Sequence, residues 1–344
     1  MKAIVVDAPG APLTLREVDA PPLPPHGARV EVRATGLCRS DWHAWVGHDD
    51  SVAWPHVPGH EFAGVVVEVG PEVRSVRPGL RVTAPFCCGC GTCPTCRDGL
   101  QNLCEREYQP GFDGWGSFAQ SVVVPWADVN VVELPEAMGF DQAAALGCRF
   151  MTAFAGLIDH GGLRPGETVA VLGAGGLGLA AIAIAAAVGA RVAAVDIDDA
   201  KLDLARAMGA AVAIDARAGD PVPALREALD GGAHVSVDAL GSPATAAQGV
   251  RALRPRGRHV QLGLLLGEQA APPVPMFELI KRELRIVGGH GMPAHRYPEM
   301  LRFVHERGID VGAWIGARRP LAEADAAMRE LGAFGTTGVT VLVP

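Results

Sequence analysis

The side chains of this 344-residue chain that could do the most chemistry are its eight cysteines, six of which fall within 18 positions. The six are Cys87, Cys88, Cys90, Cys93, Cys96 and Cys104. Four thiolates on one loop can bind zinc tetrahedrally and hold the loop in shape. Cys90, Cys93, Cys96 and Cys104 offer such a set, but Cys87 continues the same spacing, so spacing alone leaves two registers open. Free thiols at this density would be prone to oxidation, which disfavours a loop without metal.

The other two cysteines, Cys38 and Cys148, lie too far from that run to belong to it. With His60 they would make a set of two thiolates and one imidazole that leaves one zinc position open. An open position is the pattern of catalytic zinc rather than structural zinc. Taken singly, each residue has a simpler interpretation, because a lone cysteine is more often a small buried side chain. His43 and Glu61, taken singly, could be a surface histidine and a solvated acid.

A glycine-rich turn, GAGGLG at positions 173–178, fits the pattern G-x-G-x-x-G. It directly follows an apolar segment, Thr168–Leu172, and opens an alanine-rich helix. In such a motif Gly173 permits the tight turn, Gly175 lets the backbone approach a pyrophosphate, and Gly178 lets the helix pack on the strand. The first N–H groups of the helix then face the anion. The predicted cofactor-binding residues of this turn are Gly173, Gly175, Gly176, Leu177 and Gly178.

An acid stands where this motif needs one, because the next strand ends in Asp196, 23 positions after Gly173. Its carboxylate would accept hydrogen bonds from the adenosine ribose and repel a 2′-phosphate, which predicts NAD rather than NADP. The alternative is a glycine turn in a sheet that binds no cofactor, with Asp196 as a helix cap.

The candidate site residues lie in two regions of the chain that differ in composition and in secondary-structure pattern. The first ~145 residues are rich in proline, glycine and valine, and length predicts about two domains at ~150 residues each. Short β-type runs at Ala28–Ala34, Gly64–Val69 and Ala119–Val124 are separated by turn signals and predict a barrel-like β domain with long loops.

From about Gly147, strand and helix patterns alternate, which is typical of a doubly wound parallel sheet. The expected strands are Thr168–Leu172, Arg191–Asp196, Ala211–Asp215, His234–Ala239, His259–Leu262 and Leu284–Gly288. Helices are expected at Ala200–Met208, Ala224–Leu229 and Tyr297–Glu306. A final strand, Gly338–Val343, is expected to return to the first domain.

Composition excludes some partners. The net charge is −8 and no lysine or arginine block occurs, so nucleic acid is not an expected partner. Thr168–Ala190 holds 23 consecutive uncharged residues, but its glycine turn indicates strand, turn and buried helix rather than a membrane span. The N-terminus does not have the pattern of an export signal, which favours a reducing cytoplasm and metal ligands over disulfides.

Four motifs, taken together, resemble a known family. GLCRSDWH at 36–43, PGHEFAG at 58–64, the cysteine loop and GAGGLG occur in the order and spacing of zinc-dependent medium-chain alcohol dehydrogenases. The resemblance covers essentially the whole chain. It implies a GroES-like catalytic domain over residues 1–147, completed by 289–344, and a Rossmann NAD-binding domain over 148–288. The fold class is therefore α/β, with a barrel-like β domain beside a doubly wound parallel sheet.

The resemblance also assigns the metal ligands. It implies two zinc ions per chain, the catalytic zinc being held by Cys38, His60 and Cys148. It selects Cys90, Cys93, Cys96 and Cys104 as the structural set, leaving Cys87 and Cys88 without a role. Glu61 corresponds to an acid that can transiently ligate the catalytic metal, and Asp41 to the carboxylate that orients His60.

The implied reaction is reversible hydride transfer between an alcohol and NAD. In the family the proton leaves through a hydroxyl, the nicotinamide ribose and a histidine, and the matching residues are Ser40 and His43. The other residues that match cofactor contacts are Arg39 at the pyrophosphate, Lys201 at the adenosine ribose, and Leu240, Gly263 and Leu264 on the nicotinamide side. His290 is also predicted to bind the cofactor, although it lies where the family often has a small or hydroxylated residue. One departure is the stretch 335–341, which has no arginine where many relatives have one that contacts the pyrophosphate.

The substrate expected from the sequence is a hydrophobic primary alcohol or its aldehyde, because rings lie near the zinc ligands in the sequence. These rings are Trp45, Trp54, Trp115, Phe86 and Phe150. Alternatives are a polyol or a secondary alcohol, and some rings could instead pack in the core. A zinc-free reductase would lack the Cys2His set, and a non-catalytic zinc protein would have no need of Ser40 and His43. Length and the lack of a long insertion resemble tetrameric microbial members, so a homotetramer is expected.

Overall fold

The computed structural model describes all residues, Met1–Pro344, and divides into two compact units. The β unit consists of Met1–Met151, Gly291–Val304 and Asp310–Pro344. The α/β unit consists of Thr152–His290 and His305–Ile309. The division falls inside two helices, at Met151 and at Val304, and the domain limits expected from the sequence stay a prediction.

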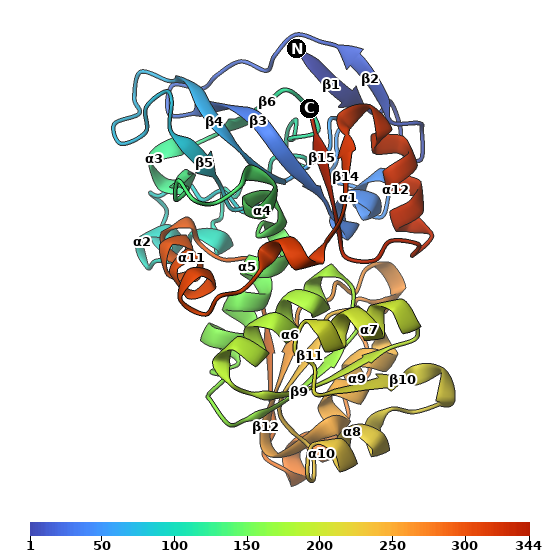
Figure 1. Cartoon of the computed structure of the whole chain (residues 1–344). Helices are drawn as coiled ribbons and strands as arrows, with labels where there is room; N and C mark the ends of the chain where they lie inside the picture. Colours follow the sequence, from blue (N-terminus) through green and yellow to red (C-terminus); the bar gives the residue numbers. More distant parts are fainter. The chain divides into compact units, whose positions relative to one another are not determined.

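The β unit is built on a seven-stranded sheet of order β14-β15-β3-β4-β5-β7, and β6 also pairs with β3. Its strands are β3 (Ala28–Leu37), β4 (Glu61–Val69), β5 (Arg81–Thr83), β6 (Ser121–Val124), β7 (Val132–Glu133), β14 (Ile315–Pro320) and β15 (Val339–Val343), and a separate hairpin joins β1 (Lys2–Val5) to β2 (Thr14–Glu17). The last strand, β15, runs antiparallel to β3 and pairs Thr340 with Leu37, so chain segments from both ends share one sheet (Figure 1).

Helices and turns of the β unit carry the cysteines. The helices of this unit are α1 (Arg39–Trp45), α2 (Pro94–Arg97), α3 (Ala127–Asn130), α4 (Phe140–Ala145), α5 (Cys148–Phe154), α11 (Tyr297–Glu306) and α12 (Ala324–Gly332), and the division cuts α5 and α11. Strand β3 alternates between buried and more exposed residues at its start, but its last four residues are all buried. It leads directly into Cys38, which is itself buried and precedes α1. The strand therefore delivers this cysteine into the interior rather than to the surface.

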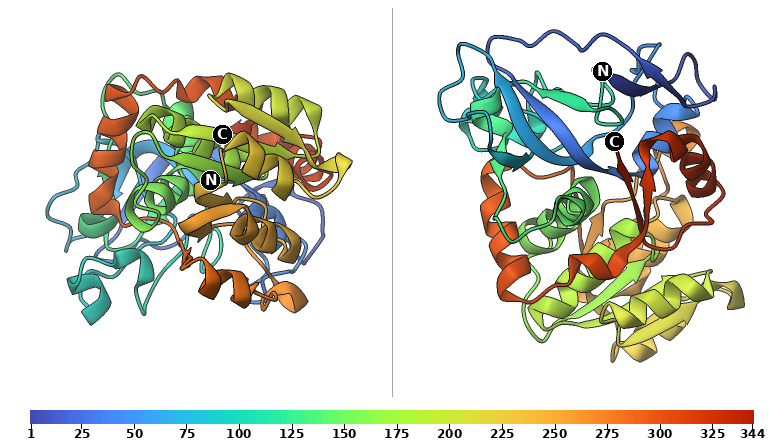
Figure 2. Two further views of the ribbon diagram at one scale, coloured as in Figure 1. Left: turned by 90° about the horizontal axis from the view of Figure 1, so that it is seen from below. Right: turned by 45° about the horizontal axis from the view of Figure 1, so that its top comes forward.

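The α/β unit is a six-stranded, fully parallel sheet of order β10-β9-β8-β11-β12-β13. Its strands are β8 (Thr168–Leu172), β9 (Arg191–Asp196), β10 (Val212–Asp215), β11 (Ala233–Asp238), β12 (Leu253–Gln261) and β13 (Arg285–Gly288), and its helices are α6 (Gly176–Val188), α7 (Asp199–Ala207), α8 (Val222–Ala228), α9 (Pro243–Ala252) and α10 (Met276–Lys281). Helix α6 contacts α7, and α9 contacts both α8 and α10. The strand order, with right-handed crossovers on either side of β8, puts these two groups of helices on opposite faces of the sheet (Figure 2). The predicted doubly wound sheet is confirmed.

The structure corrects one expectation from the sequence, the start of β12, and confirms another, the strand, turn and helix at 168–190. Strand β12 begins at Leu253 rather than at His259, because Leu253 already pairs with Ala233 of β11 before the arginine-rich stretch that follows it. The uncharged segment at 168–190 is strand β8, the glycine turn and helix α6, whose residues are buried nearly all round. None of the helices in the structure has the length and apolar character needed to cross a membrane.

The strand-to-helix turn between β8 and α6 is closely packed. A Cβ atom on Gly178 would lie 1.8 Å from the carbonyl oxygen of Gly173, whereas a Cβ on Gly175 would meet no atom of the chain within 4 Å. Gly178 is therefore required by the packing of the helix on the turn, and Gly175 is not.

We expect the two glycines to respond differently to alanine. Gly178→Ala should lower the free energy of unfolding by about 1–3 kcal/mol, the usual effect of overpacking. Gly175→Ala should cost less than about 1 kcal/mol, because Gly175 is only a helix N-cap residue here. Urea unfolding of the cofactor-free protein compares the two, and equal losses would contradict this account of the turn.

Candidate active site

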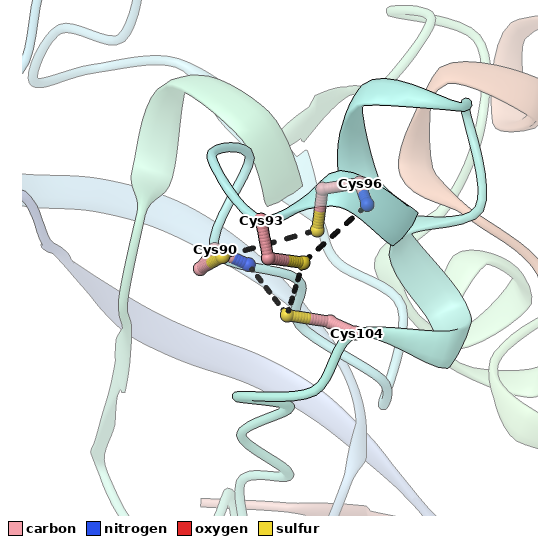
Figure 3. A group of neighbouring side chains, drawn as sticks. All are labelled: Cys90, Cys93, Cys96 and Cys104. Atoms are coloured by element: carbon pink, nitrogen blue, oxygen red, sulfur yellow. Dashed lines mark hydrogen bonds between the residues drawn. The ribbon is translucent and has the colours of Figure 1, made fainter.

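Four thiols of the cysteine loop face one another in the β unit. Cys90, Cys93, Cys96 and Cys104 are all buried, and their Sγ atoms lie within 4.8 Å of one another (Figure 3). The Sγ–Sγ separations are 3.9 Å between Cys90 and Cys96 and 3.7 Å between Cys93 and Cys104. Zinc–sulfur bonds of about 2.3 Å in a tetrahedron place sulfurs roughly 3.8 Å apart. The four thiols therefore fit a tetrahedral zinc ion.

Hydrogen bonds to sulfur lower the pKa of Cys90 and Cys93, whereas burial raises the pKa of Cys96 to about 12 and also raises that of Cys104. Backbone N–H groups of Cys90 and Arg106 donate to Cys104 Sγ, each at 3.3 Å, and the N–H of Cys96 donates to Cys93 Sγ at 3.4 Å. The Arg106 guanidinium donates to Cys90 Sγ at 3.1 Å. Burial opposes ionisation of Cys90, but hydrogen bonds from Thr92 and its neighbours outweigh it and lower the pKa of this thiol to about 5.

Cys87 and Cys88 lie outside both groups of ligands. Both are fully buried, and Cys88 belongs to the apolar core around β3 and β4. Burial raises the pKa of Cys87 to about 12 and raises the pKa of Cys88 well above its usual value. Neutral thiols packed in a core need no chemical role.

A second group gathers the isolated residues. The possible ligand atoms of Cys38, His60, Glu61 and Cys148 all lie within 4.8 Å of one another, although 110 positions separate the two cysteines. Three segments supply them: the end of β3, the start of β4 and the start of α5. The three expected ligands and the expected acid are thus brought together.

Asp41 holds this group in place. It is the third residue of α1, and its Oδ2 accepts a hydrogen bond from the N–H of Cys38 at 2.9 Å, which forms a capping box. Its Oδ1 accepts from the N–H of Gly59 at 3.1 Å and pairs with Nδ1 of His60 at 2.9 Å. Since Asp41 accepts at Nδ1, the other ring nitrogen of His60 is left as the one that can bind a metal.

The possible ligand atoms of this group are suited to binding a cation. Nε2 of His60 is buried and has no hydrogen-bond partner, which is costly for a polar atom unless a ligand takes it. Burial lowers the pKa of His60, but Asp41 outweighs it, so the pKa is raised well above its usual value. The pKa of Cys38 is lowered well below its usual value, first by the thiol of Cys148 and then, against burial, by His60. Two cysteine sulfurs together with this unpartnered imidazole nitrogen are a ligand set that fits zinc.

Arg149 is a residue of this site to which the sequence motifs assigned no role. It follows Cys148, and both its backbone N–H, at 3.2 Å, and its Nε, at 3.0 Å, donate to Oε1 of Glu61. A second guanidinium nitrogen binds the other carboxylate oxygen. Burial raises the pKa of Glu61 to about 7, and Arg149 opposes that rise. The acid expected to reach the metal is thus held by a buried arginine.

The aromatic side chains divide between site and core. Phe86 and Phe112 present their rings edge-on to His60, at centroid distances of 6.0 and 5.4 Å. Phe150 stacks on Trp314 and is fully buried, and Trp45 packs in the core beneath α12. Trp54 packs against the same core as Trp45, and Trp115 packs against another. Of the five rings expected at the substrate, Phe86 is beside a ligand, and Phe112 was missed.

The relay and pyrophosphate residues all lie on α1, with Arg39 and Ser40 at its start and His43 in its last turn. Ser40 Oγ lies 3.8 Å from Cys38 Sγ, and Nδ1 of His43 lies 2.9 Å from Nδ1 of His48. Arg39 donates to the carbonyl oxygen of Leu331 at 2.9 Å, and its guanidinium lies over the ring of Phe334 at 3.8 Å. In this structure Arg39 therefore caps the end of α12, and its pyrophosphate role stays a prediction.

In the α/β unit, the glycine turn has the form needed for NAD. The space beside Gly175 is open, since a Cβ atom there would have no atom of the chain within 4 Å, and this leaves a cradle for an approaching phosphate. Asp196 accepts from the N–H of Ala174 at 2.7 Å through Oδ2, and from the N–H of Ile197 at 2.8 Å through Oδ1. This carboxylate therefore also fixes the turn, a role additional to ribose binding.

The remaining predicted cofactor residues lie around the same edge of the sheet. Lys201 is in the first turn of α7 and forms an ion pair with Asp198 at 3.8 Å. Leu240, Gly263, Leu264 and His290 follow strands β11, β12 and β13. The loops after β11 and β12 touch closely, because Asp238 accepts from the N–H groups of Leu240 and Gly241 while its carbonyl oxygen accepts from Gly263. The carboxyl ends of parallel strands are where such folds bind nucleotides.

A β unit with a closed four-thiol set and an open Cys2His set, together with a dinucleotide-binding sheet, defines a zinc-dependent nicotinamide oxidoreductase. Comparison with known proteins is consistent with this class. Residues 24–136 match the alcohol dehydrogenase GroES-like domain, and residues 176–306 match the zinc-binding dehydrogenase domain.

Individual relatives identify the family. An alcohol dehydrogenase of Geobacillus stearothermophilus is 34% identical over 310 residues, 89% of each chain. An L-threonine 3-dehydrogenase of Symbiobacterium thermophilum is 33% identical over 350 residues, 98% of this chain and 95% of that one. Among solved structures, the alcohol dehydrogenase from Thermus sp. ATN1 has a TM-score of 0.91 at 32% identity, covering 100% and 99% of the two chains. An NAD-dependent alcohol dehydrogenase has a TM-score of 0.89 at 32% identity and covers 100% of both.

The chain belongs to the zinc-dependent medium-chain alcohol dehydrogenase family, and the resemblance carried by its four motifs is confirmed. It is an NAD-dependent alcohol oxidoreductase with zinc and NAD as cofactors.

We expect two zinc ions per chain in the fully loaded protein, as measured by elemental mass spectrometry. Cys104→Ser should remove the ion of the four-thiol set and leave one, and Cys38→Ser should remove the other. Cys88→Ala is the control, because this thiol contributes to neither group and the variant should retain two ions. A loaded wild-type chain with one ion, or a Cys38→Ser chain with two, would contradict the assignment.

Proposed function

We propose that this protein oxidises a hydrophobic primary alcohol to its aldehyde with NAD, and catalyses the reverse reaction. The observation that carries the proposal is the unsatisfied Nε2 of His60, buried between Cys38 and Cys148 and aimed by Asp41. Bound there, zinc would supply a Lewis acid that makes a hydroxyl more acidic, and NAD would supply the hydride acceptor. Residues 1–147 and 289–344 are proposed as the catalytic domain, and 148–288 as the NAD-binding domain.

Each side chain of the proposed site has a distinct task. Cys38, His60 and Cys148 hold the catalytic zinc, and Asp41 keeps His60 in the tautomer and orientation that bind it. Arg149 neutralises the charge of Glu61 and holds this acid beside the zinc ligands, where it could transiently ligate the metal. Ser40 accepts the proton of the reacting alcohol, and His43 carries that proton away from the site.

Supporting contacts favour an apolar substrate. The rings of Phe86 and Phe112 are edge-on to His60, and Arg149, the nearby cation, is already bound by Glu61. A substrate with its own carboxylate would have to compete for that arginine, at the cost of leaving Glu61 buried and unpaired. Apolar walls with few polar groups suit an alkyl or aryl alcohol.

The second candidate is a secondary alcohol, because the chain is 33% identical over 98% of its length to an L-threonine 3-dehydrogenase. Threonine carries a secondary hydroxyl beside charged amino and carboxylate groups, so its recognition needs charged partners that hydrophobic alcohols do not.

A substrate series separates the two candidates. Formation of NADH is followed with primary aliphatic and benzylic alcohols, secondary alcohols, polyols and L-threonine. We expect the largest kcat/KM for apolar primary alcohols, at least tenfold above L-threonine, which corresponds to about 1.4 kcal/mol. A preference for L-threonine or a polyol would contradict the proposed substrate and leave the zinc chemistry intact.

We also propose that the protein is a homotetramer of the cytoplasm, where its eight cysteines, none of which forms a disulfide, would stay reduced. Support for self-association comes from β13, an edge strand of the parallel sheet, and from the exposed apolar side chains of Met276, Phe277 and Ile280 on the neighbouring α10. Natural proteins rarely leave an edge strand and large apolar residues together in water.

Sedimentation velocity at micromolar concentration should therefore give a single species of four chains. Phe277→Glu combined with Ile280→Glu should dissociate it, because the added charges would have to be buried in an interface. A wild-type monomer at these concentrations would contradict the proposed assembly.

A further inference from the structure

Helix α1 ends in a turn that folds the next residues back onto it. The N–H of Gly47 donates to the carbonyl oxygen of Ala44 at 3.0 Å, and the N–H of His48 donates to that of His43 at 2.9 Å. This pair of bonds is a Schellman motif, in which the residue after the left-handed glycine returns to the last turn of the helix. Gly47 has φ of 79°, a conformation that glycine adopts without strain.

The turn places two histidines in contact. The carbonyl oxygen of His43 accepts the backbone hydrogen bond that the N–H of His48 donates, so the two residues lie against each other. Their Nδ1 atoms are 2.9 Å apart, and the two ring centroids are 5.2 Å apart. Trp42 presents its indole edge to both rings, at 5.1 and 5.5 Å.

The two rings differ in their surroundings. His43 is half-buried and His48 is exposed. Burial, then the charges of His48 and Arg39, lower the pKa of His43 to about 4, and Cys38 opposes this. Arg39 itself lies over Trp42 on the side of α12. A proton that reaches His43 is therefore not held there at neutral pH, whereas the exposed ring next to it faces water.

We propose that His48 takes the proton from His43 and delivers it to water, so that the proton leaves through two histidines in series. This inference rests on the proposed function, in which His43 receives the proton of the reacting alcohol. Nothing in the sequence motif of the family requires a histidine at this position, and His48 was not among the predicted site residues.

The transfer balances with one proton. His43 begins with its proton on Nδ1, hydrogen-bonded to the bare Nδ1 of His48, and accepts the incoming proton at Nε2. The Nδ1–H bond of His43 breaks as the Nδ1–H bond of His48 forms, and His48 releases the proton on its own Nε2 to water. Between turnovers each ring exchanges its N–H with water, which restores the starting tautomers.

The experiment uses the zinc-loaded protein with NAD and its best alcohol substrate. Stopped-flow mixing records NADH absorbance and proton release to a pH indicator for wild type, His48→Gln, His43→Gln and the double variant. His305→Gln is the matched control, an exposed histidine in the other unit. Zinc content, thermal midpoint and the Kd for NAD are measured for each, because a merely structural change would move those.

We expect proton release by His48→Gln at pH 7 to be on the order of tenfold slower, within the range of lost proton-transfer groups. Added imidazole should restore it, and His305→Gln should match wild type. The two losses should not add: in the His43→Gln background, His48→Gln should change proton release less than twofold. In addition, the imidazole NMR signals of wild type should show a hydrogen-bonded Nδ1–H on one of the two rings, and His48→Gln should lose it.

Wild-type proton release in His48→Gln, or additive losses in the double variant, would overturn the inference. Failure of wild type to couple proton release to NADH formation would instead contradict the proposed function. The two failures are therefore distinguishable in the same set of traces.

Discussion

The carboxylate of Asp41 is the contact on which the site depends. It is buried and accepts three hydrogen bonds, from the N–H groups of Cys38 and Gly59 and from the ring of His60. These partners come from two separate segments, so one side chain sets both the start of α1 and the direction in which His60 presents Nε2. Outer partners of this kind typically affect metal affinity by about 10–100-fold. Asp41 therefore links the local conformation of a helix start to the chemistry of the centre.

Burial gives the two metal groups different characters. The four-thiol set is stabilised by backbone N–H groups and by Arg106 on its own loop, which is sufficient for a closed structural site. The Cys2His set lies in the interior among Asp41, Glu61 and Arg149, where each uncompensated charge would cost several kcal/mol. A divalent cation in the open cluster would be bound by the two thiols and by the buried, unpartnered Nε2 of His60.

What could be predicted from the sequence was local. The glycine turn after β8 is a short pattern that lies where its spacing indicates. The cysteine loop is another, although its spacing left two registers open and the family resemblance chose the set that the structure brings together. Long-range contacts could not be predicted this way: Glu61 meets Arg149 across 88 positions, and Phe150 faces Trp314 rather than the ligands. His48 is an intermediate case, because a glycine followed by histidine after a helix predicts a return to the last turn, but not which side chain it meets.

The central claim is that Cys38, His60 and Cys148 form a zinc centre oriented by Asp41. The most direct measurement is a crystal structure of the zinc-loaded protein with data collected across the zinc absorption edge. The account predicts two anomalous peaks per chain, one among the four thiols and one bonded to Cys38 Sγ, Cys148 Sγ and His60 Nε2, with Nδ1 of His60 still on Asp41. A peak at the four thiols alone, or His60 bound to the metal through Nδ1, would contradict it.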